Sequence, residues 1–339
     1  MAEIPFDSLL LVSFGGPEKR EDVIPFLENV LRGRPVPRER MLEVAEHYYH
    51  FGGRSPINRQ NCELMRALEA EVGGRLPVYW GNRNWHPFLA DALREMAAHG
   101  RRRALAFITS AFSSYSGCRQ YLEDVEKARA DVGPDAPVVE RLRAFYNHPL
   151  FIAAVGERVK AAFDLIPEER RRIAHLVFTA HSIPVAMAET SDYVRQIEEA
   201  ASLAAASLGR DDYHIVYQSR SGSPGQPWLG PDIVEALGTL GGARDVVVMP
   251  IGFVSDHMEV LYDLDTEARA AAEGTGLNFV RAGTPGTHPA FVSMIVELIR
   301  ERTDGWERRA VGRYGPAPDV CRADCCPRPQ RAQPLSTRR

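Results

Sequence analysis

The sequence predicts an α/β protein of two similar doubly wound domains that face each other across a cleft. Short apolar runs of strand type alternate with amphipathic runs of helical length, which is the pattern of parallel sheets covered by helices. The second half of the chain repeats motifs of the first half in the same order. A length of 339 residues is sufficient for two domains of ordinary size.

Composition narrows the class of protein. The apolar and charged fractions, 45% and 25%, are those of a soluble globular protein. The net charge is −4 and no basic run is present, so we expect no nucleic-acid partner. No apolar run approaches the roughly 18–20 residues that span a bilayer, and the start MAEIPFDSLLLVSF lacks the features of a signal peptide. We expect a cytoplasmic protein without a transmembrane segment.

The first half opens with an apolar strand, Leu9 to Phe14, that ends at the turn Gly15-Gly16-Pro17. Helical and strand patterns alternate after this turn. We expect helices at about 20–30, 59–72 and 88–99, and strands at 76–80 and 104–110. The segment 31–58 lies between the first two helices and is rich in Arg, Pro and Tyr.

The second half repeats this plan. The repeated motifs are LVFTAHSIP (176–184) with LLVSFGGP (10–17), VYQSRSGSPGQPW (216–228) with VYWGNRNWHP (78–87), and VVMPIGFVSD (247–256) with AFITSAFSS (106–114). Chance similarity between short apolar strands is the alternative, and three matches in one order disfavour it. The alignment places Phe14 and His181 at equivalent strand ends, so one half offers an aromatic ring and the other an imidazole.

The repeat also predicts the domain bounds. The offset between the halves falls by about thirty residues after the first motif, so we interpret 31–58 as an insertion that forms a lid over the cleft. We expect an N-terminal domain at 1–146 and a C-terminal domain at 147–312, with a last helix at about 289–303 that is a candidate to pack on the first domain. A tail at 313–339 carries a cysteine cluster.

An acidic row follows the strand pattern Val246 to Ile251. Glu259, Asp263 and Glu267 stand at i, i+4 and i+8, so their carboxylates share one face of a helix. A solvated acidic surface is the usual reading of such a row. This one begins just beyond the carboxyl end of a strand, where open α/β sheets bind their ligands, so a cation site or a proton path is the alternative.

His181 ends the apolar strand that begins at Leu176. A histidine at a strand end is often an ordinary polar residue. Here, with Glu259 at the matching edge of another strand, it forms the arrangement that an acid–base pair requires. A neutral imidazole accepts a proton from a weak N–H acid or binds a divalent metal. Asp256 and His257 could cap the following helix or join the site.

The motifs SFGGP, FGGRSPIN, FTAHSIP and GFVSDHMEVLYDLD resemble those of the ferrochelatases, which insert ferrous iron into a porphyrin. The resemblance covers essentially the whole chain. It implies Rossmann-like, chelatase-like domains with four-stranded parallel sheets. It implies that His181 takes the pyrrole protons and contacts the iron, and that Glu259 contacts the iron from across the macrocycle. Asp263 and Glu267 would continue the acidic path.

The resemblance also implies how the ring is anchored. A porphyrin with carboxylate arms needs hydrogen-bond donors around an apolar slot, and by similarity Ser55 and Tyr121 are the first candidates, followed by Arg32 and Tyr48. A lid so rich in donors suits the four carboxylates of coproporphyrin III, the substrate that similarity to actinobacterial members also favours. Protoporphyrin IX and a non-catalytic tetrapyrrole carrier are the alternatives. Some of these enzymes ligate the iron with a tyrosine near Phe14, which itself has no donor.

The tail motif VCRADCCP contributes Cys321, Cys325 and Cys326. Four thiolates are the usual ligands of a [2Fe–2S] cluster, and Cys118 in the SSYSGC loop could complete the set. Several ferrochelatases resemble this chain in combining one internal cysteine with three C-terminal ones. A zinc site or free thiols are the alternatives. We further expect porphyrin and ferrous iron as partners, and the resemblance leaves open a contact with the next enzyme of the haem pathway.

Overall fold

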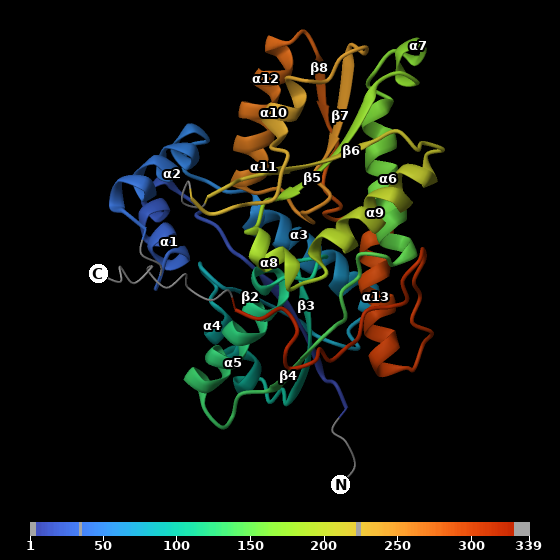
Figure 1. Ribbon diagram of the computed structural model, residues 1–339. Coiled ribbons are helices and arrows are strands. Elements are labelled where there is room, and N and C mark those ends of the chain that lie inside the picture. The colour runs from blue at the N-terminus through green and yellow to red at the C-terminus, as the bar shows by residue number, and fades with distance from the viewer. Residues whose placement is uncertain (1–4, 34–35, 222–224, 329–339) are drawn as a thin grey trace, which may run out of the picture.

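A computed structural model describes residues 5–33, 36–221 and 225–328. Two four-stranded parallel sheets form its centre, one in each half of the chain (Figure 1). Their strand orders are β2-β1-β3-β4 and β6-β5-β7-β8. Each half therefore places its first strand second in its sheet, which confirms the predicted repeat and the doubly wound fold. Right-handed βαβ crossovers, as in other doubly wound folds, give such an order of parallel strands.

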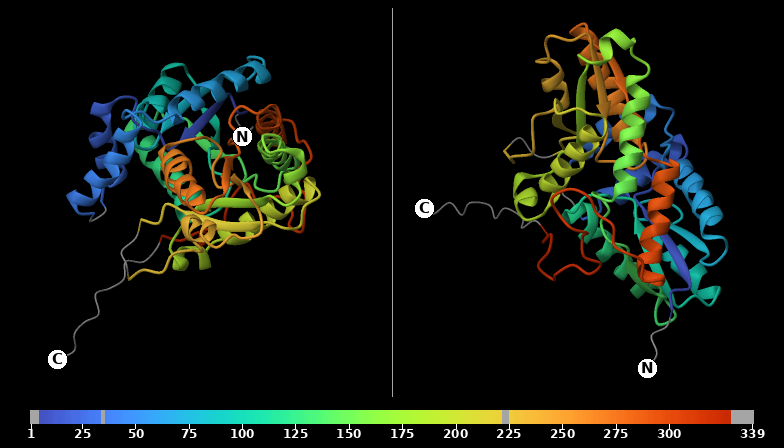
Figure 2. Two further views of the ribbon diagram at one scale, coloured as in Figure 1. Left: turned by 90° about the horizontal axis from the view of Figure 1, so that it is seen from above. Right: turned by 90° about the vertical axis from the view of Figure 1, so that its right-hand side faces the viewer.

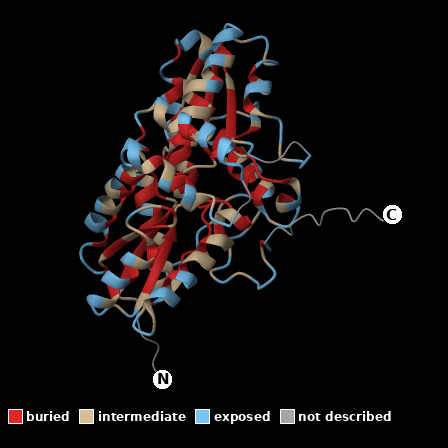
Figure 3. Ribbon diagram, turned by 90° about the vertical axis from the view of Figure 1, so that its left-hand side faces the viewer, coloured by how far each residue is buried: buried red, intermediate tan, exposed pale blue. Residues whose placement is uncertain are grey.

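The first sheet consists of β1 (Ser8–Ser13), β2 (Val78–Asn82), β3 (Arg103–Ile108) and β4 (Val138–Arg141). Its helices are α1 (Val23–Val30), α2 (Arg38–His50), α3 (Ile57–Val72), α4 (Leu89–Ala98) and α5 (Gln120–Val132). Two short turns, η1 (Arg20–Asp22) and the π-helical η2 (Tyr115–Arg119), precede α1 and α5. The central strands β1 and β3, and β5 (His175–His181) and β7 (Asp245–Met249) of the second sheet, are buried on both faces (Figure 3), which is why they read as continuous apolar runs.

The second sheet consists of β5 (His175–His181), β6 (His214–Gln218), β7 (Asp245–Met249) and β8 (Asn278–Arg281). The first helices of this half are α6 (Pro149–Phe163), α7 (Glu168–Arg171), α8 (Val185–Glu189), α9 (Tyr193–Ser207) and α10 (Ile233–Leu237). The remaining ones are α11 (Met258–Tyr262), the π-helical η3 (Asp263–Ala268), α12 (Arg269–Gly274) and α13 (Pro289–Thr303).

The two lobes exchange their last helices. α6 follows the strand β4 of the first lobe but packs against β7, β8 and α9 of the second. α13 follows β8 of the second lobe but packs against α3 of the first and against α6, as Figures 1 and 2 show. One continuous apolar core therefore runs through both lobes, from Leu9 and Leu11 through Phe151 and Phe291 to Val247.

Reciprocal histidine–glutamate contacts join the exchanged helices. His148 caps α6 by accepting from the Leu150 N–H at 3.2 Å, and its Nε2 lies 3.3 Å from Glu297 on α13. His288 caps α13 by accepting from the Ala290 N–H at 3.2 Å, and its Nε2 lies 3.2 Å from Glu157 on α6. Each histidine precedes a proline at the first helical position, where proline is favoured. The internal repeat therefore extends into the contact between the lobes.

The two contacts differ in burial, which predicts a difference in stability. The side chain of His148 is fully buried, and burial followed by the charges of Arg143 and Arg309 lowers its pKa to about 3. His148→Ala removes a cap and leaves a cavity, so we expect the free energy of unfolding to fall by about 2–4 kcal/mol. His288→Ala should cost only about 1 kcal/mol, because Glu157 is 65% exposed. Denaturant unfolding of both variants tests this, and equal losses would contradict it.

The predicted lid segment forms α2, which packs on α1 through an apolar cluster of Val23, Phe26 and Met41. α2 also reaches the acidic helix of the other lobe, because the ring of His47 stacks on Tyr262 with centroids 3.7 Å apart. A groove of about 430 Å³ lies along this contact. The insertion thus connects the two lobes.

The tail runs back from α13 across the first lobe (Figure 2). The buried guanidinium of Arg143 binds Glu301 at 2.7 Å and the carbonyl of Arg309 at 2.7 Å. The Arg119 guanidinium donates to the Cys325 carbonyl at 2.7 Å. The predicted tail residues 329–339 lie outside the described residues. None of the helices within the described ranges has the length and apolar character needed to cross a membrane.

Candidate active site

His181 and Glu259 meet at the carboxyl edge of the second sheet. His181 is the last residue of β5, and Glu259 lies in the first turn of α11 after β7. The distance from His181 Nε2 to Glu259 Oε1 is 3.7 Å. Their side chains are 30% and 46% exposed, so both face open space. The fold therefore brings the predicted pair together, and both side chains reach the same open space.

The pair lies on one side of any bound ring, which corrects one expectation. We expected Glu259 to face His181 across the macrocycle. A flat ring in van der Waals contact with a group on each face needs about 7 Å between those groups, and 3.7 Å leaves no such space. Both residues come from the second lobe, so the other face of the ring belongs to the first lobe.

Each residue of the pair shifts the pKa of the other so that both charged forms are favoured. Burial alone would lower the pKa of His181, but the carboxylate of Glu259 outweighs it and raises that pKa. Burial alone would raise the pKa of Glu259, but His181 lowers it to about 2. The Nδ1 atom of His181 lies 2.5 Å from the Ser182 carbonyl oxygen. Nδ1 is therefore the protonated nitrogen of the neutral ring, and the lone pair of Nε2 is free to accept a proton.

The surrounding residues hold the pair in place. The Tyr193 hydroxyl donates to the backbone oxygen of His181 at 2.9 Å. His257 caps α11 by accepting from the Glu259 N–H at 3.2 Å, so the cap alternative is confirmed for His257. Asp256 instead binds Arg281 at 3.1 Å and lies in a structural ion pair.

The acidic row continues from α11 into a π-helical turn. In an α-helix, residues four apart rotate about 40° past one full turn at each step. The wider turn of η3 from Asp263 to Ala268 rotates less per residue, so it compensates for this drift and keeps the carboxylates on one side. Burial, followed by the charges of Glu259 and Glu267, raises the pKa of Asp263 to about 7. Asp263 is therefore suited to exchange protons near neutral pH.

Three of the predicted porphyrin residues belong to the first lobe, and the carboxylates of this row act on two of them. Phe14 follows β1 directly, and its ring meets Phe26 edge-on at 6.2 Å. Burial and then the charges of Glu259 and Asp263 raise the pKa of Tyr48, so its hydroxyl lies near the acidic row. Tyr121 lies in the first turn of α5 and is buried. Burial raises its pKa, and the charge of Glu259 adds a smaller increase.

The other two predicted porphyrin residues, Ser55 and Arg32, have different surroundings. Ser55 is buried against the glycine turn after β1, because a Cβ atom at Gly16 would come within 2.7 Å of the Ser55 Cβ. Arg32 is exposed and donates to the side chain of Asn29 in the preceding helix. The structure thus places Ser55 beside Gly16 and Pro17 and leaves Arg32 at the surface beyond α1.

Arg83 is a site residue that the sequence interpretation missed. Its guanidinium lies 4.3 Å from the ring of Tyr121 and 5.8 Å from that of Phe14, and Asp124 holds it at 2.5 Å. Its side chain is only 6% exposed. The sequence contained one signal, because Arg83 lies in the repeated motif VYWGNRNWHP, whose counterpart in the second half contains Arg220.

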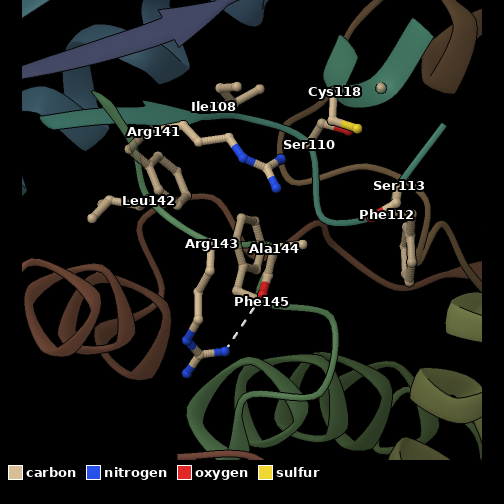
Figure 4. A pocket seen from close by; sticks show the side chains of 12 residues that line it. Ile108, Ser110, Phe112, Ser113, Cys118, Arg141, Leu142, Arg143, Ala144 and Phe145 are labelled. Atoms are coloured by element: carbon tan, nitrogen blue, oxygen red, sulfur yellow. Dashed lines mark hydrogen bonds between the residues drawn. The ribbon is translucent and has the colours of Figure 1, made fainter. Parts of the chain in front are cut away.

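The four predicted cluster cysteines come together beside the first sheet. The sulfur of Cys118 lies 4.0 Å from that of Cys326, which lies 3.5 Å from that of Cys325. The Cys321 sulfur accepts a hydrogen bond from Arg141 at 2.7 Å. The Cys326 thiol lowers the pKa of Cys118 to about 6. Figure 4 shows Cys118 and Arg141 on a pocket of about 10 Å³, room for one water at most.

The positions of these thiols do not by themselves establish a metal site. Across residues 5–33, 36–221 and 225–328, no three His, Cys, Asp or Glu side chains are arranged to hold a metal ion. The [2Fe–2S] cluster is therefore not confirmed and stays a prediction. The iron contacts expected from His181 and Glu259 also stay a prediction, because these two side chains form a pair and not a group of three.

Comparison with known proteins identifies relatives over nearly the whole chain. Residues 7–303 match the family model described as ferrochelatase. A ferrochelatase of Rhodopirellula baltica is 53% identical, over 99% of this chain and 98% of its own. Proteins named coproporphyrin III ferrochelatase are 52% identical in Nocardia farcinica, over 96% and 97% of the two chains, and 51% identical in Frankia alni, over 98% and 89%.

Solved structures share the fold at low identity. SirB of Bacillus subtilis, solved with Fe³⁺, superimposes with a TM-score of 0.56 at 11% identity, over 88% of this chain and 96% of its own. CbiX, described as the terminal enzyme of sirohaem synthesis in denitrifying bacteria, gives a TM-score of 0.50 at 16% identity, over 86% and 98%. The expected chelatase-like fold of two Rossmann-like domains is therefore confirmed.

Proposed function

The chain belongs to the ferrochelatase family, and we propose that it inserts ferrous iron into coproporphyrin III to form iron coproporphyrin III in haem biosynthesis. The observation that supports this best is the His181–Glu259 pair, 3.7 Å apart and open to solvent, opposite the aromatic face of the first lobe. The relatives from Nocardia farcinica and Frankia alni, about half identical over nearly the full length, carry the name of this activity.

The chain's own residues account for the proton chemistry. Metal insertion replaces two pyrrole N–H protons by one Fe²⁺ ion. The neutral imidazole of His181 accepts a pyrrole proton at Nε2, and the carboxylate of Glu259 stabilises the imidazolium that forms. Asp263, with a pKa of about 7, and Glu267 then carry protons outward along the row or guide the cation inward. His181 and Glu259 are also the proposed contacts of the entering iron.

The first lobe supplies the opposing surface. Binding energy from the rest of the ring can be used to bend it so that its N–H groups leave the plane. Phe14 and Tyr48 offer apolar surface on this side, and Tyr121 offers a hydroxyl. The guanidinium of Arg83 is suited to a propionate arm. Ser55 and Arg32 remain proposed contacts of outer arms, together with the lid.

A direct comparison of substrates tests the proposal. Iron insertion is measured with coproporphyrin III and with protoporphyrin IX at equal concentrations under reducing conditions. We expect kcat/KM to favour coproporphyrin III by at least tenfold. Preference for protoporphyrin IX would support the alternative substrate, and binding of either ring without metal insertion would support a carrier. A cytoplasmic location and contact with the next enzyme of the haem pathway remain part of the proposal.

We also propose that Cys118, Cys321, Cys325 and Cys326 hold a [2Fe–2S] cluster. What supports this is the approach of thiols from distant parts of the sequence, with the Cys118 and Cys326 sulfurs 4.0 Å apart. Such a cluster would supply four iron–thiolate bonds that tie the tail to the loop at 110–119. Iron and sulfide analysis and visible absorption of the purified protein test this. A colourless protein that lacks sulfide would exclude the cluster.

A further inference from the structure

Two consecutive residues of the second lobe contact successive turns of the acidic row. Gln218 is the last residue of β6 and is 1% exposed. Its side-chain amide donates to the backbone oxygen of Glu259 at 2.9 Å. Ser219 follows directly, and its hydroxyl donates to the carboxylate of Asp263.

Gln218 is held firmly by the neighbouring strand. It pairs with His181 in the parallel register of β5 and β6. The Thr179 hydroxyl donates to its side-chain oxygen at 3.1 Å, and the Ser182 N–H donates to its backbone oxygen at 2.7 Å. One buried amide therefore connects the strand that carries His181 to the helix that carries Glu259.

Ser219 has an unusual backbone conformation. Its φ is 63°, a left-handed value that few residues other than glycine adopt and that disfavours an ordinary L side chain. Such conformations persist where the surrounding structure requires them, and they cluster at functional sites. Here the conformation directs the hydroxyl toward Asp263.

Both contacts fall where the helix changes its winding. The Glu259 oxygen already accepts from the N–H of Asp263, which it shares with the oxygen of Val260. This shared bond marks the junction between α11 and the π-helical η3. A π-helical turn is rare and tends to occur at functional sites. Hydrogen bonds from residues outside the helix can stabilise such a π-helical turn.

We infer that Gln218 and Ser219 are positioning residues that hold this wide turn, so that Asp263 stays in line with Glu259. The inference rests on the proposed function of the acidic row. It explains why a serine occupies a left-handed position next to the site. It also assigns Ser219 a role through Asp263, without contact to the porphyrin. Loss of this alignment should therefore slow the supply of ferrous iron and the removal of protons along the acidic row.

Ser219→Gly tests the inference, because glycine keeps the backbone conformation and loses the hydroxyl. We expect kcat/KM for ferrous iron to fall by about tenfold, the effect of a lost hydrogen bond to a charged group. The KM for porphyrin should not change. Ser219→Asn should recover part of the loss, because asparagine tolerates left-handed φ and its amide can donate. Ser221→Gly, the same change at an exposed position two residues on, is the control.

Iron kinetics of Ser219→Gly within twofold of the wild type would overturn the inference. An equal loss in Ser219→Asn would also overturn it, as would a parallel rise in the KM for porphyrin. Failure of the proposed function is distinguishable, since the unaltered enzyme would then not insert iron into the porphyrin at all.

Discussion

Replacing His181 with alanine is expected to abolish iron insertion while porphyrin binding is retained. The imidazole is the proposed acceptor of the pyrrole proton, and its Nε2 lies 3.7 Å from Glu259. A positioned general base contributes about 10²–10⁴-fold to a rate, so kcat should fall by that amount. Porphyrin affinity should change by less than threefold, because most of the ring contacts come from other residues. Fluorescence quenching of the porphyrin and single-turnover iron insertion measure the two quantities.

His175 offers a matched control for this variant. It is the first residue of the same strand, β5, and His181 is the last. It therefore lies at the opposite edge of the sheet, where its Nε2 is 3.1 Å from the Gly241 oxygen. His175→Ala should insert iron at the normal rate. Normal turnover by His181→Ala would refute the assignment of the base.

Glu259→Gln is expected to lower kcat by about 10²-fold and to move its pH dependence. The carboxylate of Glu259 raises the pKa of His181, and removing that charge lowers it. The imidazole accepts a proton only when it is neutral, so activity increases as pH rises through the His181 pKa. The acid limb of the kcat profile should therefore shift to lower pH in Glu259→Gln, even though the rate at every pH is lower.

A control for the pH experiment lies on the same helical segment. Glu273 is exposed in α12, beyond the end of the acidic row. Glu273→Gln makes the same chemical change and should leave both the rate and the profile unaltered. A shift of the acid limb to higher pH in Glu259→Gln would contradict the proposed interaction between the two residues.

The position of the proposed catalytic pair could be predicted from the sequence because it depends on local patterns. An apolar run followed by a polar residue marks the carboxyl end of a buried parallel strand, and this places both His181 and Glu259 at one edge. The internal repeat also predicts that the two sheets share one strand order, since two copies of one pattern fold in the same way. The bounds of the strands and helices agree with the predicted ones to within a few residues.

The distances between the residues of the site could not be predicted from sequence patterns. We placed Glu259 across the macrocycle from His181, whereas the fold of β5 against β7 brings them to 3.7 Å on one side. Arg83 joins the site only because Asp124 and Tyr121 of α5 lie beside the end of β2. The hydrogen bond from Arg32 to Asn29 of the preceding helix also could not be predicted from sequence patterns.

Sequence patterns alone predict the alternation of strands and helices, the repeat and the sheet edge that carries the candidate site. These properties depend on hydrophobic periodicity over a few residues. Only the folded structure shows the contact between α6 and α13, the π-helical turn at Asp263 and the place of Arg83 beside Tyr121. Each of these depends on contacts between residues far apart in the chain, whose geometry is set by how the complete core packs.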